Sequence, residues 1–200
     1  MDEHISAMAR PSNREKLLCE GLRVVHERGF AGASVRDIVQ AAGVPQGSFT
    51  NHFASKEAFG LEIIERYYAA ARAQLDETLA NPTLSPLQRL RAWIHAAKEQ
   101  LACDDMRRGC LLGNFAAEAS EHSEPIRRRL TEIFAETESA IAGCLRAAID
   151  AGELPAGFDC PGTAGFILAA LQGANLLAKA QRSPAPVERF EQILFSRVLR

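Results

Sequence analysis

Residues 34–57 read SVRDIVQAAGVPQGSFTNHFASKE, a segment that predicts two short helices separated by a tight turn. Ser34 and Asp37 have the spacing of a capping box, in which each residue satisfies a backbone N–H near the other. They predict a short helix that runs to Ala42 and ends at Gly43, since glycine readily takes the left-handed conformation that closes a helix.

A second short helix is predicted directly afterwards. Phe49 and Phe53 lie four positions apart and therefore share one face, and Pro45 suits a first helical turn. Two short helices joined by a tight Ala-Gly-Val turn are typical of a helix-turn-helix, whose second helix enters the major groove of DNA.

The polar residues of this segment are suited to DNA. With both phenylalanines facing inward, the opposite side of the second helix presents groups that can bond bases or phosphates, and Gly47 lets the backbone approach closely. Basic side chains and helix N-termini on either side can hold phosphates. The candidate DNA-binding residues are Ser34, Arg36, Gln46, Gly47, Ser48, Thr50, Asn51, His52 and Lys56. Spacing alone leaves open a solvated surface helix with two buried phenylalanines.

The rest of the chain also predicts helices, because no segment alternates apolar and polar residues as a strand does. The sequence predicts an all-α protein of about nine helices, with an N-terminal domain at residues 1–59 and a sensing and dimerisation domain at residues 60–200. Outside the helix-turn-helix, helices are expected at residues 12–28, 55–79, 85–102, 111–119, 123–152, 162–181 and 185–199.

Bulk composition excludes several classes of protein. The net charge is −2, and residues 1–59 carry seven Lys or Arg against seven Asp or Glu, so charge totals do not indicate DNA binding. The start MDEHISAMARPSN lacks the basic cluster and apolar run of a secretory signal. No stretch of about 18 apolar residues is free of polar interruptions, so we expect a cytoplasmic protein with no membrane contact.

The five cysteines are widely spaced and contain no CxxC pair, which argues against a zinc site or a disulfide framework. We expect most of them to be reduced thiols in the core, and we expect no metal and no cofactor. Cys144 is expected in the core and Cys160 in a loop.

Residues 12–60 resemble the N-terminal signature of the TetR family of repressors. The resemblance rests on the run from Ser34 to Val39, on Ala42-Gly43-Val44, on Gly47-Ser48-Phe49, on His52-Phe53 and on Ser55-Lys56-Glu57. It implies that residues 46–52 meet operator DNA, with Arg36 on the preceding helix and Lys56 at the start of the fourth. The family usually has Tyr where this chain has Thr50, so the phosphate contact of that phenol is shortened or lost. The resemblance also implies a homodimer through the last two helices.

One site stands out in residues 60–200. Cys110 lies at a predicted helix start directly after Arg107 and Arg108, and both features favour the reactive thiolate. The alternative is a small buried residue under the next turn. Lys179 is the only charged residue between Asp159 and Arg182, and it either extends outward to solvent or points at something specific. Facing inward, it would stabilise the thiolate or meet a carboxylate ligand.

The segment GCLLGNFAAE at residues 109–118, with LAKA at residues 177–180, resembles TetR-type repressors that control detoxification of quinones, maleimides, aldehydes and acrylate-like compounds. This resemblance implies that a small-molecule inducer oxidises or alkylates Cys110 and changes the packing of the sensing domain. The helix at residues 56–79 would then change the separation of the two recognition helices. Trp93 and Phe115 are candidates to line an apolar pocket, beside Phe134 and Phe166.

Two alternatives remain open at this stage. A repressor could bind an apolar or carboxylate ligand reversibly, with Lys179 as counter-charge. An enzyme could use Cys110 as nucleophile and His95 or His122 as base, but nothing places those histidines beside the thiol, and the DNA-binding module would be unexplained. We therefore expect a repressor and not an enzyme.

Overall fold

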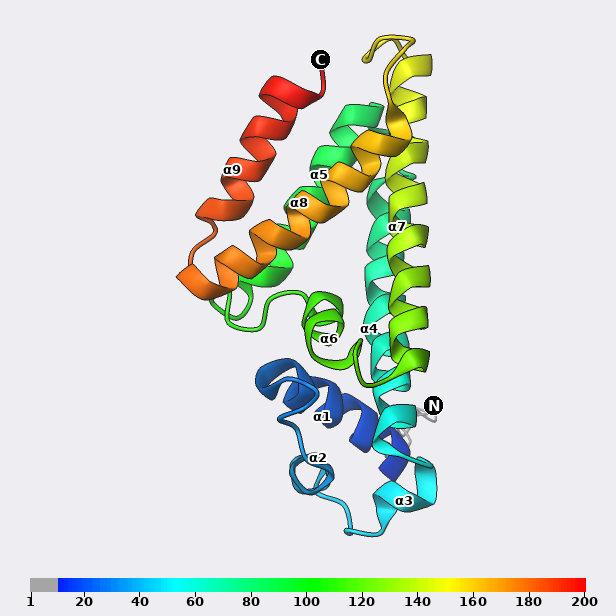
Figure 1. Ribbon diagram of the computed structural model, residues 1–200, viewed down its shortest axis with the longest axis vertical. Coiled ribbons are helices and arrows are strands. Elements are labelled where there is room, and N and C mark those ends of the chain that lie inside the picture. Colours follow the sequence, from blue (N-terminus) through cyan, green and yellow to red (C-terminus); the bar gives the residue numbers. More distant parts are fainter. Residues whose placement is uncertain (1–10) are drawn as a thin grey trace, which may run out of the picture. The chain divides into compact units, whose positions relative to one another are not determined.

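The computed structural model describes residues 11–200, and in that range it is all-helical, as predicted (Figure 1). Residues 1–10, which include most of the segment where the sequence predicts no secretory signal, lie outside the described residues. The nine α-helices of the described range are α1 Asn13–Arg28, α2 Val35–Ala42, α3 Ser48–His52, α4 Lys56–Thr78, α5 Pro86–Ala102, α6 Leu111–Ala119, α7 Glu124–Asp150, α8 Cys160–Gln181 and α9 Ala185–Ile193.

The chain divides into two compact units, the first ending at Ile63 and the second beginning at Ile64. Helix α4 begins in the first unit and continues without a break into the second. The boundary after residue 59 that the sequence suggests stays a prediction.

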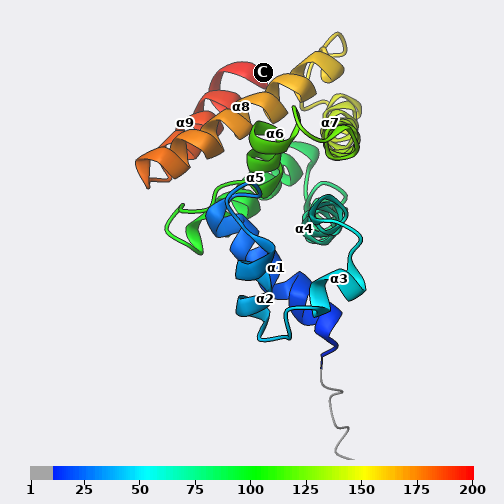
Figure 2. The same cartoon turned by 60° about the horizontal axis from the view of Figure 1, so that its bottom comes forward.

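In the first unit α1, α2 and α3 pack on one another (Figure 2). Its centre is a cluster of three rings, Phe49, Phe53 and Phe59, whose centroids lie 4.9 to 5.2 Å apart. Helix α1 approaches this cluster closely at Gly21, because a Cβ there would lie 2.3 Å from Phe59 Cζ. The predicted inward face of Phe49 and Phe53 is therefore confirmed, and both are buried.

Helix α2 begins and ends where its sequence predicts. The Ser34 hydroxyl accepts a hydrogen bond from the Asp37 N–H at 3.1 Å, and the Asp37 carboxylate accepts one from the Ser34 N–H at 3.0 Å. Gly43 takes the left-handed conformation (φ 60°, ψ 37°) and turns the chain toward α3.

Helix α3 is shorter than predicted, and the placement of Pro45 in its first turn is wrong. Pro45 to Gly47 form a turn before the helix, closed by a 2.9 Å hydrogen bond from the Ser48 N–H to the Pro45 carbonyl. Gly47 has a high entropic cost in a helix, which favours a start at Ser48.

The second unit is built on α5, α7, α8 and α9, whose apolar sides meet in one core. Figure 1 shows α9 lying along α8, and α8 crossing α7. Helix α8 is long and apolar enough to cross a membrane by length and composition alone. Its packing on α7 and α9 also explains this composition, since a helix in a protein core must be apolar as well.

Two details at the ends of this unit differ from the sequence-based expectation. The last helix is not regular to residue 199, because α9 ends at Ile193 and residues 194–198 form one π-helical turn, with the Leu199 N–H bonded to the Leu194 carbonyl. Cys160 is buried as the first residue of α8 and is not in a loop, since the Asp159 side chain caps that helix at the Gly162 N–H.

Candidate DNA-reading face and cysteine site

The polar side chains of α2 and α3 form one candidate DNA-reading face. Most of the residues that the sequence selected for it are exposed, namely Ser34, Arg36, Gln46, Gly47, Thr50, Asn51 and His52. Because Phe49 and Phe53, which directly follows α3, are both buried, Thr50, Asn51 and His52 turn outward together. The face therefore carries donors and acceptors of the kinds that bases and phosphates require.

The charge of this face differs from the neutral total of its unit. Asp37 is the only acidic residue between residues 29 and 56, and its carboxylate is bound by Ser34 and lies 2.8 Å from Arg28 Nη1. Those hydrogen bonds from Ser34 and the charge of Arg28 lower the pKa of Asp37. Acidic residues of α1, in contrast, pair with Arg23 on their own helix. The face is therefore free of unpaired negative charge, which the residue totals could not show.

Ser48 does not belong to this face. It is 7% exposed, so the prediction that it faces outward is wrong. The reason is the shorter helix: as the first residue of α3, Ser48 lies against the turn at Pro45 instead of on the outer side of a longer helix.

Three other predicted contacts already have partners within the protein. The Thr50 hydroxyl donates to the Gly47 carbonyl at 3.1 Å, and the Ser34 hydroxyl donates to the Asp37 carboxylate at 2.5 Å. Lys56, at the start of α4, lies 3.4 Å from the Ala31 carbonyl and 4.8 Å from the ring centre of Phe30. A phosphate would therefore have to compete with these partners.

Cys110 lies directly before α6, as predicted, where it is the N-terminal capping residue and is partly exposed. Gln172 of α8 donates a hydrogen bond from Nε2 to the Cys110 sulfur at 3.6 Å. The Tyr67 hydroxyl of α4 makes hydrogen bonds with the Cys110 side chain and the Leu111 backbone. Burial, and then the electrostatic effect of the neighbouring Cys110 side chain, raise the pKa of Tyr67, so its phenol keeps its proton and can donate to the sulfur.

The loop before Cys110 has an unusual backbone. Asp105 and Met106 have positive φ values of 56° and 60°, and neither is a glycine. Such residues each cost on the order of 1 kcal/mol and persist only where neighbours hold them. The Asp104 carboxylate does so by accepting from the Arg107 and Arg108 N–H groups at 3.2 and 3.1 Å.

Lys179 points toward this loop and not to solvent. Its Nζ donates to Asn114 Oδ1 at 3.2 Å, and a Cβ at Gly109 would lie 3.1 Å from its Cδ. The Asn114 amide in turn donates to the Arg108 carbonyl at 2.9 Å. Lys179 is thus held, through Asn114, beside the turn at Arg108 and Gly109 that directly precedes Cys110.

Other candidates lie elsewhere. Trp93 and Phe115 are buried, Trp93 within the core of the second unit. Phe166, expected in a pocket, is 51% exposed on α8. His95 and His122 are exposed on α5 and after α6. Among residues 11–200 no three His, Cys, Asp or Glu side chains are grouped to hold a metal ion.

The expectation that most cysteines lie in the core is wrong. Cys144 is buried, its sulfur donates to the Pro86 carbonyl at 3.1 Å, and burial raises its pKa to about 11. Cys160 is also buried, but Cys19 and Cys103 are exposed. Exposed thiols can be alkylated without any surrounding binding site, so an assay of Cys110 has to distinguish its modification from that of Cys19 and Cys103.

Sequence reasoning missed Tyr67, Gln172 and Asn114 as neighbours of the cysteine site. Gln172 lies seven positions before Lys179 on an apolar helix, so the two polar residues share one face, and this spacing could have revealed it. Tyr67 gave no such signal, because its meeting with Cys110 joins distant parts of the chain.

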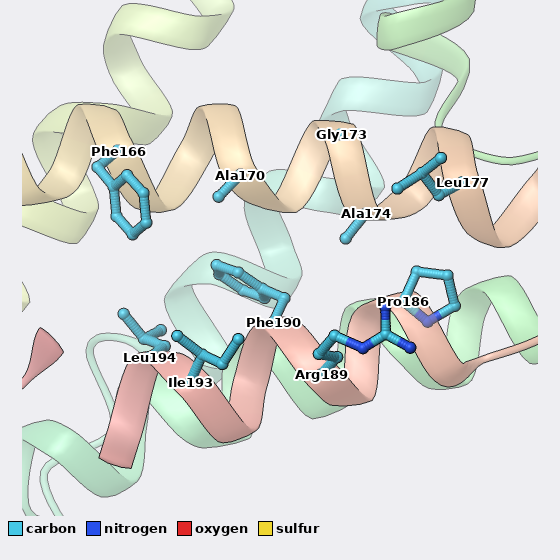
Figure 3. Close-up of a pocket in the computed structure, with 10 residues that line it drawn as sticks. All are labelled: Phe166, Ala170, Gly173, Ala174, Leu177, Pro186, Arg189, Phe190, Ile193 and Leu194. Carbon is cyan, nitrogen blue, oxygen red and sulfur yellow. The ribbon is translucent and has the colours of Figure 1, made fainter. Parts of the chain in front are cut away.

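An apolar groove of about 370 Å³ lies between α8 and α9 (Figure 3). On α8 it is bordered by small residues, Ala170, Gly173 and Ala174, between the larger Phe166 and Leu177. Phe190 and Ile193 of α9, and Leu194 directly after it, line the other side. The large apolar side chains left exposed in the described residues are all on these two helices: Phe166, Leu176, Leu177 and Ile193.

Comparison with known proteins agrees with this architecture. Residues 17–63 match the model for bacterial regulatory proteins of the tetR family, and residues 86–194 match the tetracyclin repressor-like C-terminal domain. The HTH-type transcriptional repressor DhaR of Mycobacterium sp. (strain GP1) is 34% identical over 96% of this chain and 95% of that protein.

Two solved structures are similar as well. The reduced form of E. coli NemR has a TM-score of 0.78 and 30% identity, covering 91% of this chain and 95% of that one. The TetR family regulator CifR, solved as a cysteine mutant with 26bp double-strand operator DNA, has a TM-score of 0.78 and 25% identity, covering 93% of this chain and 98% of that one. The chain belongs to the TetR family of bacterial regulatory proteins.

Proposed function

We propose that this protein is a transcriptional repressor that binds operator DNA as a homodimer and leaves it when a small electrophile or oxidant modifies Cys110. The observation that carries the proposal is the setting of Cys110: a partly exposed thiol at a helix start, bonded by donors from two other helices. Helix N-termini and hydrogen-bond donors stabilise thiolates. The relatives are transcriptional regulators, which supports a repressor and not an enzyme. As a DNA-binding regulator, the protein would act in the cytoplasm.

The exposed face of α2 and α3 supports DNA binding. Gln46 and Asn51 have side-chain amides that match the donor and acceptor pattern of base edges, and Arg36 is a phosphate ligand. CifR, which shares this fold, was solved with operator DNA. Ser48 is left out of the proposed contacts because it is buried.

The groove between α8 and α9 supports a homodimer through the last two helices. An exposed apolar face of this kind is unfavourable in a monomer, and a second copy of the same face would cover it. Leu176 and Leu177 are 66% and 52% exposed and would become buried in the four-helix arrangement.

Modification of Cys110 would act by breaking its hydrogen bonds. An alkylated or oxidised sulfur is larger and cannot keep both the Tyr67 and the Gln172 contacts. Tyr67 is part of α4, the continuous helix whose first turns belong to the DNA-binding unit. We propose that α4 transmits the change from Cys110 to the recognition helices.

Lys179 favours a second candidate, reversible induction by a carboxylate ligand. Its ammonium is partly buried and makes an amide contact, and in residues 11–200 it has no carboxylate partner. A ligand carboxylate could replace the Asn114 contact.

Operator release tests the proposal. Wild type and Cys110→Ser are bound to DNA from upstream of the protein's own gene, treated with N-ethylmaleimide or hypochlorite, and assayed for release, with reduction after hypochlorite. Release of wild type but not of Cys110→Ser, with equal affinity before treatment, is the expected result. Equal release of both would contradict covalent sensing and favour the reversible ligand.

A further inference from the structure

Three polar residues of α8 form a stripe beside Cys110. Gln172, Asn175 and Lys179 are three and four positions apart, so they are successive neighbours on one side of a mostly apolar helix. Gln172 reaches the sulfur of Cys110, directly before α6, and Lys179 reaches Asn114 in α6. Asn175 lies between them.

Asn175 is the member whose side-chain oxygen is buried without a hydrogen bond. It is 7% exposed, and its Oδ1 is buried and accepts no hydrogen bond from any residue that the structure describes. A buried acceptor left unsatisfied is rare and costs about 1–3 kcal/mol. An isosteric leucine would avoid this cost, so the amide oxygen calls for a donor that the protein itself does not supply.

The hydrogen bonds of Gln172 and Lys179, the two neighbours of Asn175 on this side of α8, are weak enough to be exchanged. The Gln172 bond to sulfur is long at 3.6 Å, and Gln172 Oε1 lies over Gly113, where a Cβ would be only 3.0 Å away. Lys179 is held by a neutral amide and, among residues 11–200, by no carboxylate. A small molecule can therefore take over these groups without breaking an ion pair.

We propose that Asn175, Gln172 and Lys179 form with Cys110 a subsite for an α,β-unsaturated amide. The Asn175 oxygen accepts the N–H of the amide, Lys179 donates to its carbonyl oxygen, and its β-carbon meets the sulfur. Quinones and unsaturated carboxylates lack the donor that Asn175 requires. The inference rests on the proposed function, because it names the electrophile that the Cys110 site would select.

The chemistry balances without a further reactant. The Cys110 thiol loses its proton to solvent, and the thiolate sulfur forms a bond to the β-carbon as the carbon–carbon π bond breaks. The electron pair passes to the α-carbon and the carbonyl, where the Lys179 ammonium stabilises it. Water then protonates the α-carbon, so the net change is addition of S–H across the double bond.

The experiment compares acrylamide with N,N-dimethylacrylamide, which has the same double bond and carbonyl but no N–H. The rate of adduct formation on the Cys110 peptide of the full-length reduced protein is measured by mass spectrometry and divided by the rate with glutathione. We expect the ratio of the acrylamide rate to the N,N-dimethylacrylamide rate to be about tenfold higher for wild type than for glutathione, which corresponds to one buried hydrogen bond. In Asn175→Leu this preference should vanish, while Gln181→Leu, an exposed amide at the end of the same helix, should keep it.

Thermal unfolding of Asn175→Leu shows whether the variant is folded, and the wild-type comparison of the two reagents stands without any variant. If wild type prefers acrylamide no more than glutathione does, the proposed subsite is wrong. If both reagents still release operator DNA in that case, the proposed function stands and only the inference fails. If Cys110 is modified by neither reagent nor by N-ethylmaleimide, the proposed function itself fails.

Discussion

The amide of Gln172 donates a hydrogen bond to the sulfur of Cys110, joining α8, a proposed dimer helix, to the start of α6. Donors to sulfur stabilise the thiolate more than the thiol. Gln172→Leu should therefore slow alkylation of Cys110 at neutral pH by several-fold to about tenfold. The rate of monobromobimane labelling on the Cys110 peptide measures this, with Gln181→Leu as the control. An unchanged rate would show that Gln172 only fills space.

Tyr67→Phe should have a larger effect on signalling than on labelling. It removes a donor to the Cys110 side chain and an acceptor for the Leu111 backbone N–H, and it does so on α4, which enters the DNA-binding unit. We expect operator release at a given extent of Cys110 modification to be weaker than in wild type. Release that follows modification as in wild type would exclude Tyr67 from the pathway to DNA.

Operator binding should respond differently to two changes on the reading face. Arg36→Ala removes a proposed phosphate contact, so affinity should fall for all sequences and the slope of log K against log salt should decrease by about 1. Gln46→Ala removes a proposed base contact, so it should lower discrimination between operator and mutated sites by about 1–3 kcal/mol and leave the slope unchanged. Salt titrations of binding on both DNAs separate the two roles, and identical behaviour would contradict the assignment.

Leu177→Glu should disrupt the dimer. Leu177 is half exposed on the α8–α9 groove, and a second copy of this face would bury the new carboxylate without a partner. Sedimentation should show a shift toward monomer and operator affinity should drop. Ala80→Glu, at an exposed position after α4, is the matched control and should remain dimeric. A dimeric Leu177→Glu would place the interface elsewhere.

Acid should remove the stabilisation that Asp37 gives. Hydrogen bonds from Ser34 and the nearby Arg28 lower the pKa of Asp37 in the folded protein below its ordinary value of 3.8. A lowered folded pKa stabilises the protein above that ordinary value, and the stabilisation is lost as pH falls through the folded pKa. Asp37→Asn should thus melt below wild type at neutral pH, and the gap should narrow as the pH falls below 3.8 and through the lower folded pKa. A gap independent of pH would contradict the charged role of Asp37.

Local signals predicted the elements well and long-range contacts poorly. Ser34, Asp37 and Gly43 fix the ends of α2 by bonds within a few residues, which is why the capping box and the turn were visible in the sequence. The burial of Ser48 and the π-helical turn after Ile193 depend on packing that no local pattern records.

At the cysteine site, too, the local features were predictable from the sequence and the long-range contacts were not. The position of Cys110 at the start of α6 follows from its neighbours in sequence, and the structure confirms it. Its contacts to Tyr67 and Gln172 join residues 43 and 62 positions away, so only the fold brings them together. The orphaned oxygen of Asn175 is visible only once burial is known.

If modification of Cys110 alone releases the operator, release must follow the extent of that modification in a titration. In a Cys19→Ser, Cys103→Ser background, which removes the two exposed thiols, N-ethylmaleimide is added in steps. At each step intact mass gives the fraction of chains modified, and fluorescence anisotropy gives the fraction of operator bound. Operator release should rise with the modification of Cys110 and be complete when the site is fully modified. Full modification of Cys110 with the operator still bound would contradict it.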